Sequence, residues 1–317
     1  MVKLFLGVDG GKSTTIALVG DETGRVAGAG SAGPSNHAEG EEGRAKLVGA
    51  VEESVAGACR QAGVDFREVQ FEAACLGFSG GPEDKQALVA QTVRAGHLIV
   101  TTDAVVALAG ATGGDPGVVV IAGTGSIGFG KNAAGKTARA GGWGYIFGDE
   151  GGGFDLARQG LRAALRYEEG WGPATKLLAM FLEASGAKSA NDLLHRFYTA
   201  EFPRPRIASL GPVVERAAAE GDQVAGGILR KAAAELALLA AAVRRQLFAP
   251  GERAVVAHMG GVFRSAILRD QFRELVEQER GNVCGPPLYP PAGGALLEAY
   301  RACGMSLRLT GLPDVKR

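Results

Sequence analysis

The sequence is poor in cysteine, histidine and aromatic residues: 317 residues include 4 cysteines and 4 histidines, and aromatic residues make up 6%. The cysteines are scattered and form no C-x-x-C pair, and no two histidines have H-x-x-x-H spacing. These absences argue against a disulfide framework and against a zinc site. Unpaired cysteines are typical of a reducing compartment, so we expect a cytoplasmic protein with reduced thiols.

The chain also lacks net charge and a long apolar run. Lys and Arg total 34 and Asp and Glu total 34, so the formal net charge is +0. No bulk attraction to nucleic acid or to an anionic membrane follows from such a balance. The most apolar segment, 236–243, is too short to span a membrane and is flanked by Glu235 and Arg244. The chain enters a predicted strand directly, so we expect no signal peptide. We therefore expect no nucleic-acid partner and no membrane partner.

Glycine, by contrast, is abundant, with 50 residues that gather at turns and in segment 141–153. The first such turn lies within Leu4–Val19, where one apolar run enters it and a second leaves it. The β-branched residues that follow the turn, Thr14, Thr15 and Ile16, favour a strand over a helix. This stretch therefore predicts a β-hairpin.

The turn of this hairpin has the chemistry of a phosphate site. Its glycines allow backbone N–H groups to approach an anion, and Lys12, Ser13 and Thr14 add donors. Asp9 would be tolerated beside a phosphate with a divalent cation between them. A Walker A loop is rejected, because it needs a glycine where Leu6 stands and a helix after the turn. Taken alone, the turn is better interpreted as an ordinary glycine-rich hairpin turn.

A second copy of this pattern changes that assessment. Residues 117–130 again read as strand, small polar turn and strand, and a third glycine turn at Gly260 and Gly261 follows the apolar run 255–259. Such an internal repeat is typical of a duplicated unit. We expect two phosphate-binding hairpins placed face to face.

Between these turns, strands alternate with helices, as in a layered α/β protein. Strands are predicted at 72–78, 97–102, 136–140 and 253–258, and helices at 41–62, 83–95, 222–248, 263–280 and 292–303, with an Ala-rich helix after Asp103. A Gly- and Pro-containing stretch at 112–117 marks a boundary. We expect two domains, residues 1–113 and residues 114–317.

Six short motifs occur in order along nearly the whole chain: Gly7–Gly11, Ser35–His37, Thr101–Ala104, Gly123–Ser126, Gly141–Gly144 and Gly148–Gly151. As an ordered set they resemble the N-acetylglucosamine kinases and the BadF/BadG/BcrA/BcrD-type ATPase family, within the actin, sugar-kinase and heat-shock ATPase superfamily. The resemblance implies two actin-like (ribonuclease H-like) domains that flank an interdomain cleft. It also implies that the final helix, about 292–303, packs back on the first domain.

The resemblance assigns roles residue by residue. Asp103 would be the general base, and Asp9 would hold Mg²⁺. ATP would be bound by Gly10, Gly11, Lys12, Ser13, Thr124, Gly125, Gly260 and Gly261. The sugar would be bound by Asn36, Ser79, Asp103, Ser126, Ile127, Gly142, Trp143, Gly144 and Asp149. The first turn departs from the family's common Gly-Gly-Gly-Thr, since it reads Gly11-Lys12-Ser13. That departure leaves the role of Lys12 open, and the role of Glu150 is open too.

Several of these residues also suit purely local roles. Asp103 precedes a predicted helix, where Asp is a common N-cap. Asn36 lies in a loop of turn-forming residues. Trp143 could anchor a loop, and Asp149 could begin a helix with favourable dipole charge.

The expected function is ATP-dependent phosphorylation of N-acetylglucosamine at its 6-hydroxyl, with ATP and Mg²⁺ as cofactors. Other acceptors remain open, namely glucosamine, N-acetylmuramate, glucose and mannose. Two other classes are alternatives: a redox activator ATPase, which would need suitably placed cysteines, and a sugar-sensing regulator, which would need a DNA-binding element. A small-molecule sugar is the expected partner, and a homodimer is left open.

Overall fold

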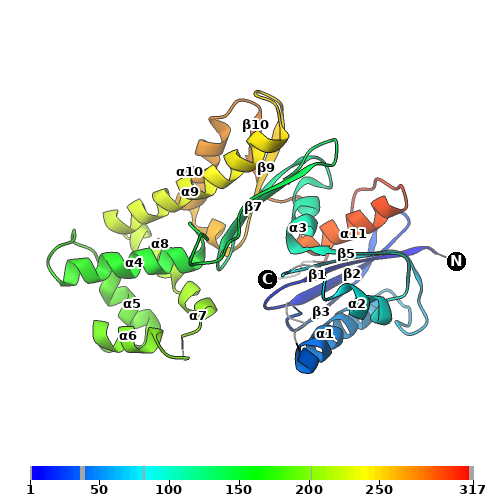
Figure 1. The fold of residues 1–317 in the computed structure, drawn as a ribbon, viewed down its shortest axis with the longest axis horizontal. Coiled ribbons are helices and arrows are strands. Elements are labelled where there is room, and N and C mark those ends of the chain that lie inside the picture. The colour runs from blue at the N-terminus through cyan, green and yellow to red at the C-terminus, as the bar shows by residue number, and fades with distance from the viewer. Residues whose placement is uncertain (1, 36–39, 81–82, 201, 314–317) are drawn as a thin grey trace. The chain divides into compact units, whose positions relative to one another are not determined.

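The computed structural model describes residues 2–35, 40–80, 83–200 and 202–313. The chain divides into two compact units (Figure 1). The first unit contains Met1–Asp115 and Pro287–Arg317, and the second contains Pro116–Pro286. Each unit is built on a five-stranded mixed sheet covered by helices, which confirms the predicted α/β class.

The first unit has the sheet order β3-β2-β1-β4-β5. β1 pairs antiparallel with β2 and parallel with β4, and β5 extends the parallel part. The hairpin predicted at the N-terminus is therefore present as β1 and β2. The elements of this unit are β1 (Leu4–Gly10), β2 (Thr15–Asp21), β3 (Val26–Ala32), α1 (Gly40–Gln61), β4 (Phe71–Phe78), α2 (Gln86–Thr92), β5 (Ala95–Thr102), α3 (Asp103–Thr112) and α11 (Pro291–Ala302).

Both faces of this sheet are buried, because successive side chains of a strand point to opposite faces. Leu6 and Val8 of β1 join a core with α1 and α2, whereas Phe5 joins a second core with α3 and α11. Helix α11 thus brings residues near the C-terminus of the chain onto the first sheet. This arrangement explains why β1 reads as a nearly continuous apolar run rather than an alternating one.

Two glycines permit the close approach of α11. A Cβ atom on Gly7 would lie 2.2 Å from the backbone nitrogen of Leu296. A Cβ atom on Gly294 would lie 1.9 Å from the carbonyl oxygen of Val106 in α3. Gly7 belongs to the first sequence motif, yet its place in the fold is to admit a helix against the sheet.

The second unit repeats the topology of the first. Its sheet order is β10-β9-β6-β7-β8, which, read from the other edge, matches the first sheet strand by strand. β6 pairs antiparallel with β7 and parallel with β9, as β1 pairs with β2 and β4. The predicted internal duplication is confirmed at the level of topology. The elements are β6 (Gly117–Ala122), β7 (Ser126–Lys131), β8 (Thr137–Gly141), α4 (Gly153–Glu168), α5 (Leu177–Ser185), α6 (Ala190–Phe197), α7 (Arg204–Ala208), α8 (Gly211–Ala219), α9 (Gln223–Leu247), β9 (Ala254–Met259), η1 (Gly261–Arg264), α10 (Ala266–Glu277) and β10 (Asn282–Gly285).

The structure differs from the sequence prediction in the last part of this unit. The single helix predicted at 263–280 is a 3₁₀ turn, η1, followed by α10. Ser265 separates them, because its hydroxyl caps α10 by accepting from the Leu268 N–H. The edge strand β10 was not predicted, since its four residues are too few to show a period.

Helix α9, the longest helix described, begins at a buried cap. The Asp222 carboxylate accepts from the backbone N–H groups of Val224, Ala225 and Lys176 and from the Thr175 hydroxyl. Burial alone would raise the pKa of Asp222, but these hydrogen bonds outweigh it and hold the pKa below its ordinary value.

Replacement of Asp222 by alanine is expected to lower the free energy of unfolding by ~2 kcal/mol, because it removes a cap and leaves buried donors unpaired. Asp222→Asn can still cap the helix, so its free energy of unfolding should fall by less. The lowered folded-state pKa means that the carboxylate stabilises the protein above its unfolded-state pKa, and that this stabilisation is lost as pH falls through the folded-state value. Urea denaturation at neutral and acid pH measures both effects. Equal stability of wild type and Asp222→Ala at neutral pH would contradict the prediction.

The thiols are largely inside the protein. Cys59, Cys75 and Cys284 are buried, and Cys303 at the end of α11 is half-buried. Burial raises the pKa of Cys59 to about 11 and that of Cys284 to about 12, and it raises the pKa values of Cys75 and Cys303 as well.

We expect iodoacetamide to alkylate the folded protein slowly, and at Cys303 first, because reaction requires an accessible thiolate. Mass spectrometry of peptides from native and urea-unfolded protein measures this order. Rapid labelling of Cys59 or Cys75 in the native protein would show that the cores of the first unit are not packed as described.

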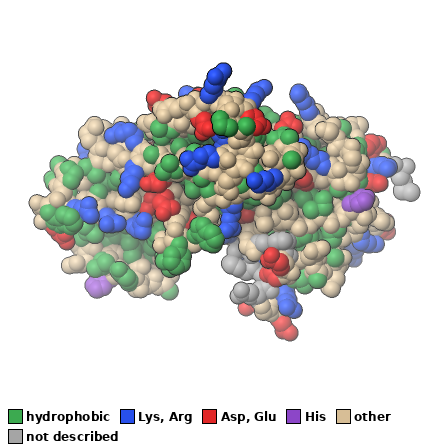
Figure 2. Space-filling view, turned by 45° about the horizontal axis from the view of Figure 1, so that its top comes forward, with side chains coloured by type: hydrophobic (Ala, Val, Ile, Leu, Met, Phe, Trp, Pro, Cys, Tyr) green, Lys and Arg blue, Asp and Glu red, His purple; other side chains and the backbone are tan. Residues whose placement is uncertain are grey.

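The charged side chains of the surface are of both signs. On the face shown in Figure 2, acidic and basic side chains are interspersed. No helix within the described residues is both long enough and apolar enough to cross a membrane.

Candidate active site

In the first unit, predicted residues meet at the carboxyl ends of the three parallel strands β1, β4 and β5. The strands are in register, with Gly10 opposite Phe78 and Phe78 opposite Thr102. The residues that follow, Ser79 and Asp103, therefore emerge at the same edge. The Ser79 N–H donates to the Gly10 carbonyl at 3.1 Å, and the Ser79 hydroxyl donates to Asp103 Oδ2 at 2.6 Å. In open α/β sheets, this edge is where ligands bind.

Asp103 is not the N-cap of α3. That position is held by Thr102, whose hydroxyl accepts from the Val105 N–H at 3.4 Å. Asp103 is the first residue of the helix and is half-buried. Its carboxylate is therefore free of the capping role and is oriented by Ser79. A fixed carboxylate at a strand end can accept a proton from a bound hydroxyl group.

The corner of the first hairpin is tight and exposes its polar side chains. The Gly11 N–H donates to the Thr14 carbonyl at 2.9 Å, and Lys12, Ser13 and Thr14 are exposed. Gly10 is required by packing, because a Cβ atom there would lie 2.3 Å from the ring of Phe78. The predicted sugar ligand Asn36 lies outside the described residues.

In the second unit, the corner between β6 and β7 supports the start of α4. The Gly123 carbonyl accepts from the Gly153 N–H at 2.8 Å, and the Thr124 carbonyl accepts from the Phe154 N–H at 3.1 Å. Gly123 is exposed, and Thr124 is half-buried at the tip of the turn. Helix α4 thus supports the corner through these hydrogen bonds, while Gly123 remains exposed to solvent.

The third glycine turn lies beside the β6–β7 corner. Gly260 follows β9, the strand next to β6, and has φ 108°. A Cβ atom there would lie 2.3 Å from the Ala122 carbonyl oxygen, so only glycine fits between the strand ends. A Cβ atom on Gly123 or Gly261 would meet no heavy atom within 4 Å.

Asp149 joins the loop after β8 to the β6–β7 corner. It is 6% exposed and has φ 65°, a left-handed conformation that is rare for a residue other than glycine. Asp149 Oδ1 accepts from the Ser126 N–H at 3.2 Å, and the Ser126 hydroxyl donates to the Glu150 carbonyl at 2.6 Å. Ser126 and Asp149, both predicted sugar ligands, are therefore in direct contact.

The glycine-rich loop places Trp143 on the surface beside this contact. The Gly142 N–H donates to the Ser126 carbonyl at 3.0 Å, and a Cβ atom on Gly142 would lie 2.8 Å from the side chain of Ile127. Trp143 is 66% exposed, and the Arg139 guanidinium lies 4.7 Å from the centre of its ring. With one ring face covered by Arg139, the indole can offer its other face to a ligand. Gly144, with φ 83°, follows it.

Arg204, the first residue of α7, belongs to this group although no sequence motif includes it. Its Nη2 forms an ion pair with Asp149 Oδ2. Its guanidinium lies over the rings of Tyr145 and Phe154, 5.0 Å and 5.8 Å from their centres. Arg204 is 55 residues from Asp149 in the sequence, and no periodicity or spacing links the two.

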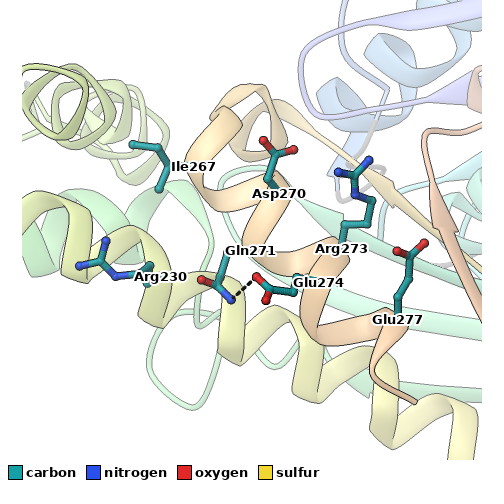
Figure 3. A pocket seen from close by; sticks show the side chains of 7 residues that line it. All are labelled: Arg230, Ile267, Asp270, Gln271, Arg273, Glu274 and Glu277. Carbon is teal, nitrogen blue, oxygen red and sulfur yellow. Dashed lines mark hydrogen bonds between the residues drawn. The ribbon is translucent and has the colours of Figure 1, made fainter. Parts of the chain in front are cut away.

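A separate hollow of about 600 Å³ lies between α9 and α10 (Figure 3). Charged side chains of both signs line it, and Gln271 and Glu274 face one another across a hydrogen bond of 3.5 Å. None of the residues predicted from sequence lines this hollow. It is therefore distinct from the candidate site.

The two corners have features that suit a nucleotide. In the first unit, Ser13 and Thr14 are exposed and can donate to phosphate oxygens. In the second unit, the open space at Gly123 and Gly261 leaves room for a phosphate group. Within the described residues, no group of three or more His, Cys, Asp or Glu side chains could by itself hold a metal ion. A cation at Asp9 would therefore need oxygen ligands from phosphate and water.

Residues 6–299 match the BadF/BadG/BcrA/BcrD ATPase family. The chain belongs to this family. It is 35% identical over 282 residues to the N-acetylmuramic acid/N-acetylglucosamine kinase of Clostridium acetobutylicum, covering 87% of this chain and 90% of that protein. It is 30% identical over 316 residues to the N-acetyl-D-glucosamine kinase of Dictyostelium discoideum, covering 93% and 97%.

Solved structures agree on the fold. The crystal structure described as an N-acetylglucosamine kinase from Chromobacterium violaceum has a TM-score of 0.75 and 29% identity, over 93% of this chain and 98% of that one. A ROK family glucokinase from Streptomyces griseus, with a TM-score of 0.57 and 21% identity, covers 94% of this chain and 99% of its own. These neighbours confirm the predicted actin-like sugar-kinase fold.

Proposed function

We propose that this enzyme is an ATP-dependent kinase that phosphorylates an amino sugar. The named relatives are kinases of N-acetylglucosamine or of N-acetylmuramic acid, and they align over most of this chain and of their own lengths. The finer proposal is transfer of the γ-phosphoryl group to the 6-hydroxyl of N-acetylglucosamine.

The observation that carries the proposal is the Ser79–Asp103 pair at the ends of β4 and β5. Asp103 would accept the proton of the attacking hydroxyl as the bond to phosphorus forms. Phosphoryl transfer needs little else from protein side chains beyond positioning and neutralisation of charge. Ser79 would hold the carboxylate in one orientation and could also contact the sugar.

ATP would be held at the three glycine turns, by Gly10, Gly11, Lys12, Ser13, Thr124, Gly125, Gly260 and Gly261. When bound, ATP with Mg²⁺ supplies the phosphoryl group and neutralises its charge. Asp9 is the residue that we propose to orient the cation. Lys12 is exposed on the first corner, where its ammonium group suits a phosphate oxygen.

The residues that we propose to bind the sugar are Asn36, Ser79, Ser126, Ile127, Gly142, Trp143, Gly144 and Asp149. Trp143 would provide an apolar wall, and Asp149 would accept from sugar hydroxyls. A site that hydrogen-bonds particular hydroxyls discriminates strongly among sugars. That is the basis for proposing one preferred acceptor.

A coupled assay of ADP release tests the proposal. We expect N-acetylglucosamine to give the highest kcat/KM in a panel with N-acetylmuramate, glucosamine, glucose and mannose. A higher value for another member would replace the acceptor but leave the kinase proposal in place. ADP release that no sugar stimulates would contradict the proposed function itself.

A further inference from the structure

We propose that Arg204 is a positioning residue for sugar binding, which holds the Asp149 carboxylate in the orientation that the sugar requires. This inference rests on the proposed function, because it takes Asp149 as a sugar ligand. It concerns a residue outside every sequence motif, and its evidence lies wholly within the second unit.

Asp149 is a nearly buried carboxylate. A carboxylate that is 6% exposed needs a partner, since an unpaired buried charge is costly. Its two oxygens have different partners: Oδ1 accepts from the Ser126 N–H, and Oδ2 forms the ion pair with Arg204. Arg204 is the cation among the described residues that meets this carboxylate. Removal of Arg204 would leave Oδ2 without its charged partner.

The side chain of Asp149 is closely packed against its neighbours. A Cβ atom on Gly125 would lie 2.2 Å from Asp149 Oδ2, so the carboxylate is pressed against the backbone of the β6–β7 corner. The left-handed backbone of Asp149, with φ 65°, is held in part by the Gly152 N–H, which donates to the Asp149 carbonyl at 3.1 Å. Such a conformation persists only where the surroundings fix it. Arg204 supplies the contact to Oδ2, while the Ser126 N–H contacts Oδ1.

Arg204 is itself restrained by its neighbours. Its guanidinium lies over Tyr145 and Phe154, whose own ring centres are 5.2 Å apart. Stacking on aromatic rings restrains a guanidinium in a way that an ammonium group does not reproduce. Pro203 and Pro205 flank it at the start of α7 and limit the backbone. Arg204 is thus fixed before any ligand arrives.

One atom of this guanidinium also remains available. Arg204 Nε is buried and has no hydrogen-bond partner within the described part of the chain. An unsatisfied buried donor is unfavourable, and an oxygen brought by a ligand or by water would satisfy it. This donor lies in the side chain that already contacts the proposed sugar ligand.

The test compares Arg204→Gln, Arg204→Lys and Arg204→Ala with wild type. We expect Arg204→Gln to raise the KM for N-acetylglucosamine about tenfold, or ~1.4 kcal/mol, while the KM for ATP changes less than about twofold. Arg204→Lys should recover only part of the loss, because it restores charge without the planar stack. Guanidinium ion, at concentrations far below those that unfold the protein, should lower the sugar KM of Arg204→Ala.

The matched control is Arg158→Gln in α4. Arg158 forms an ion pair with Asp155 at 2.7 Å. Arg158 is close in sequence to Asp149, but among the ion pairs of the described residues Asp149 is paired with Arg204 and not with Arg158. This variant should keep the wild-type KM values.

Two outcomes would overturn the inference. In one, Arg204→Gln has the sugar KM of wild type. In the other, its sugar KM and ATP KM rise together, its thermal stability falls, and guanidinium restores nothing, which would show a purely structural role. Both are distinct from failure of the proposed function, in which the wild-type enzyme shows no sugar-stimulated ADP release.

Discussion

Replacement of Asp103 by asparagine is expected to lower kcat by roughly 10²–10⁴-fold, the range that a general acid or base contributes. The amide has nearly the same shape as the carboxylate but cannot take up the hydroxyl proton. Asp103 lies outside the capping position of α3, which Thr102 holds, so the fold should tolerate the change. Steady-state ADP release measures kcat, and nucleotide titration should give nearly the wild-type ATP affinity.

Ser79→Ala is the matched control for this variant. It removes the 2.6 Å hydrogen bond to Asp103 Oδ2 but leaves the carboxylate in place. We therefore expect a smaller loss of kcat than in Asp103→Asn. Turnover of Asp103→Asn within a few-fold of wild type would show that another group takes the proton, or that none needs to.

The second large effect is expected at Gly294, where α11 meets α3. A Cβ atom there would lie 1.9 Å from the Val106 carbonyl oxygen and 2.2 Å from the Gly110 nitrogen, and both are backbone atoms that cannot rotate away. Gly294→Ala must separate the two helices. We expect a loss of about 3 kcal/mol in the free energy of unfolding, at the upper end of the usual cost of overpacking.

Gly227→Ala in α9 is the control for this substitution. A Cβ atom at Gly227 would meet no heavy atom within 4 Å. We therefore expect Gly227→Ala to raise the free energy of unfolding by ~0.5–1 kcal/mol, the usual effect of replacing a helical glycine by alanine. Urea denaturation of both variants measures the contrast. A stable Gly294→Ala protein would show that α11 is not seated against α3 as described.

The fold was largely predictable, because its signals are local and repeated. The β-branched residues after the first glycine turn identified β2 as a strand, which excluded a Walker A loop. The same pattern at 117–130 identified the duplication that the two sheets share. Elements without such signals were missed. β10 has four residues and takes its place by pairing with β9, and the division between η1 and α10 depends on the hydroxyl of Ser265.

The candidate site was predictable only in part, because a motif gives residue types but not contacts. Ser79, Asp103, Ser126 and Asp149 were predicted as site residues one by one, and the structure pairs Ser79 with Asp103 and Ser126 with Asp149. Arg204 could not be found in this way, since its partner Asp149 lies 55 residues away in the sequence. The two rings beneath its guanidinium, Tyr145 and Phe154, come together only on folding. The capping role of Thr102 was likewise decided by a hydroxyl orientation that composition does not reveal.

The most direct test of this account is the position of the new phosphoester. Wild-type enzyme, ATP, Mg²⁺ and N-acetylglucosamine should give a product whose phosphorus couples, in a two-dimensional ¹H–³¹P NMR spectrum, to the two protons on carbon 6 of the sugar. Asp103→Asn under the same conditions should give little of it. Coupling to another sugar proton would contradict the proposed acceptor, and inorganic phosphate as the sole product would contradict the kinase.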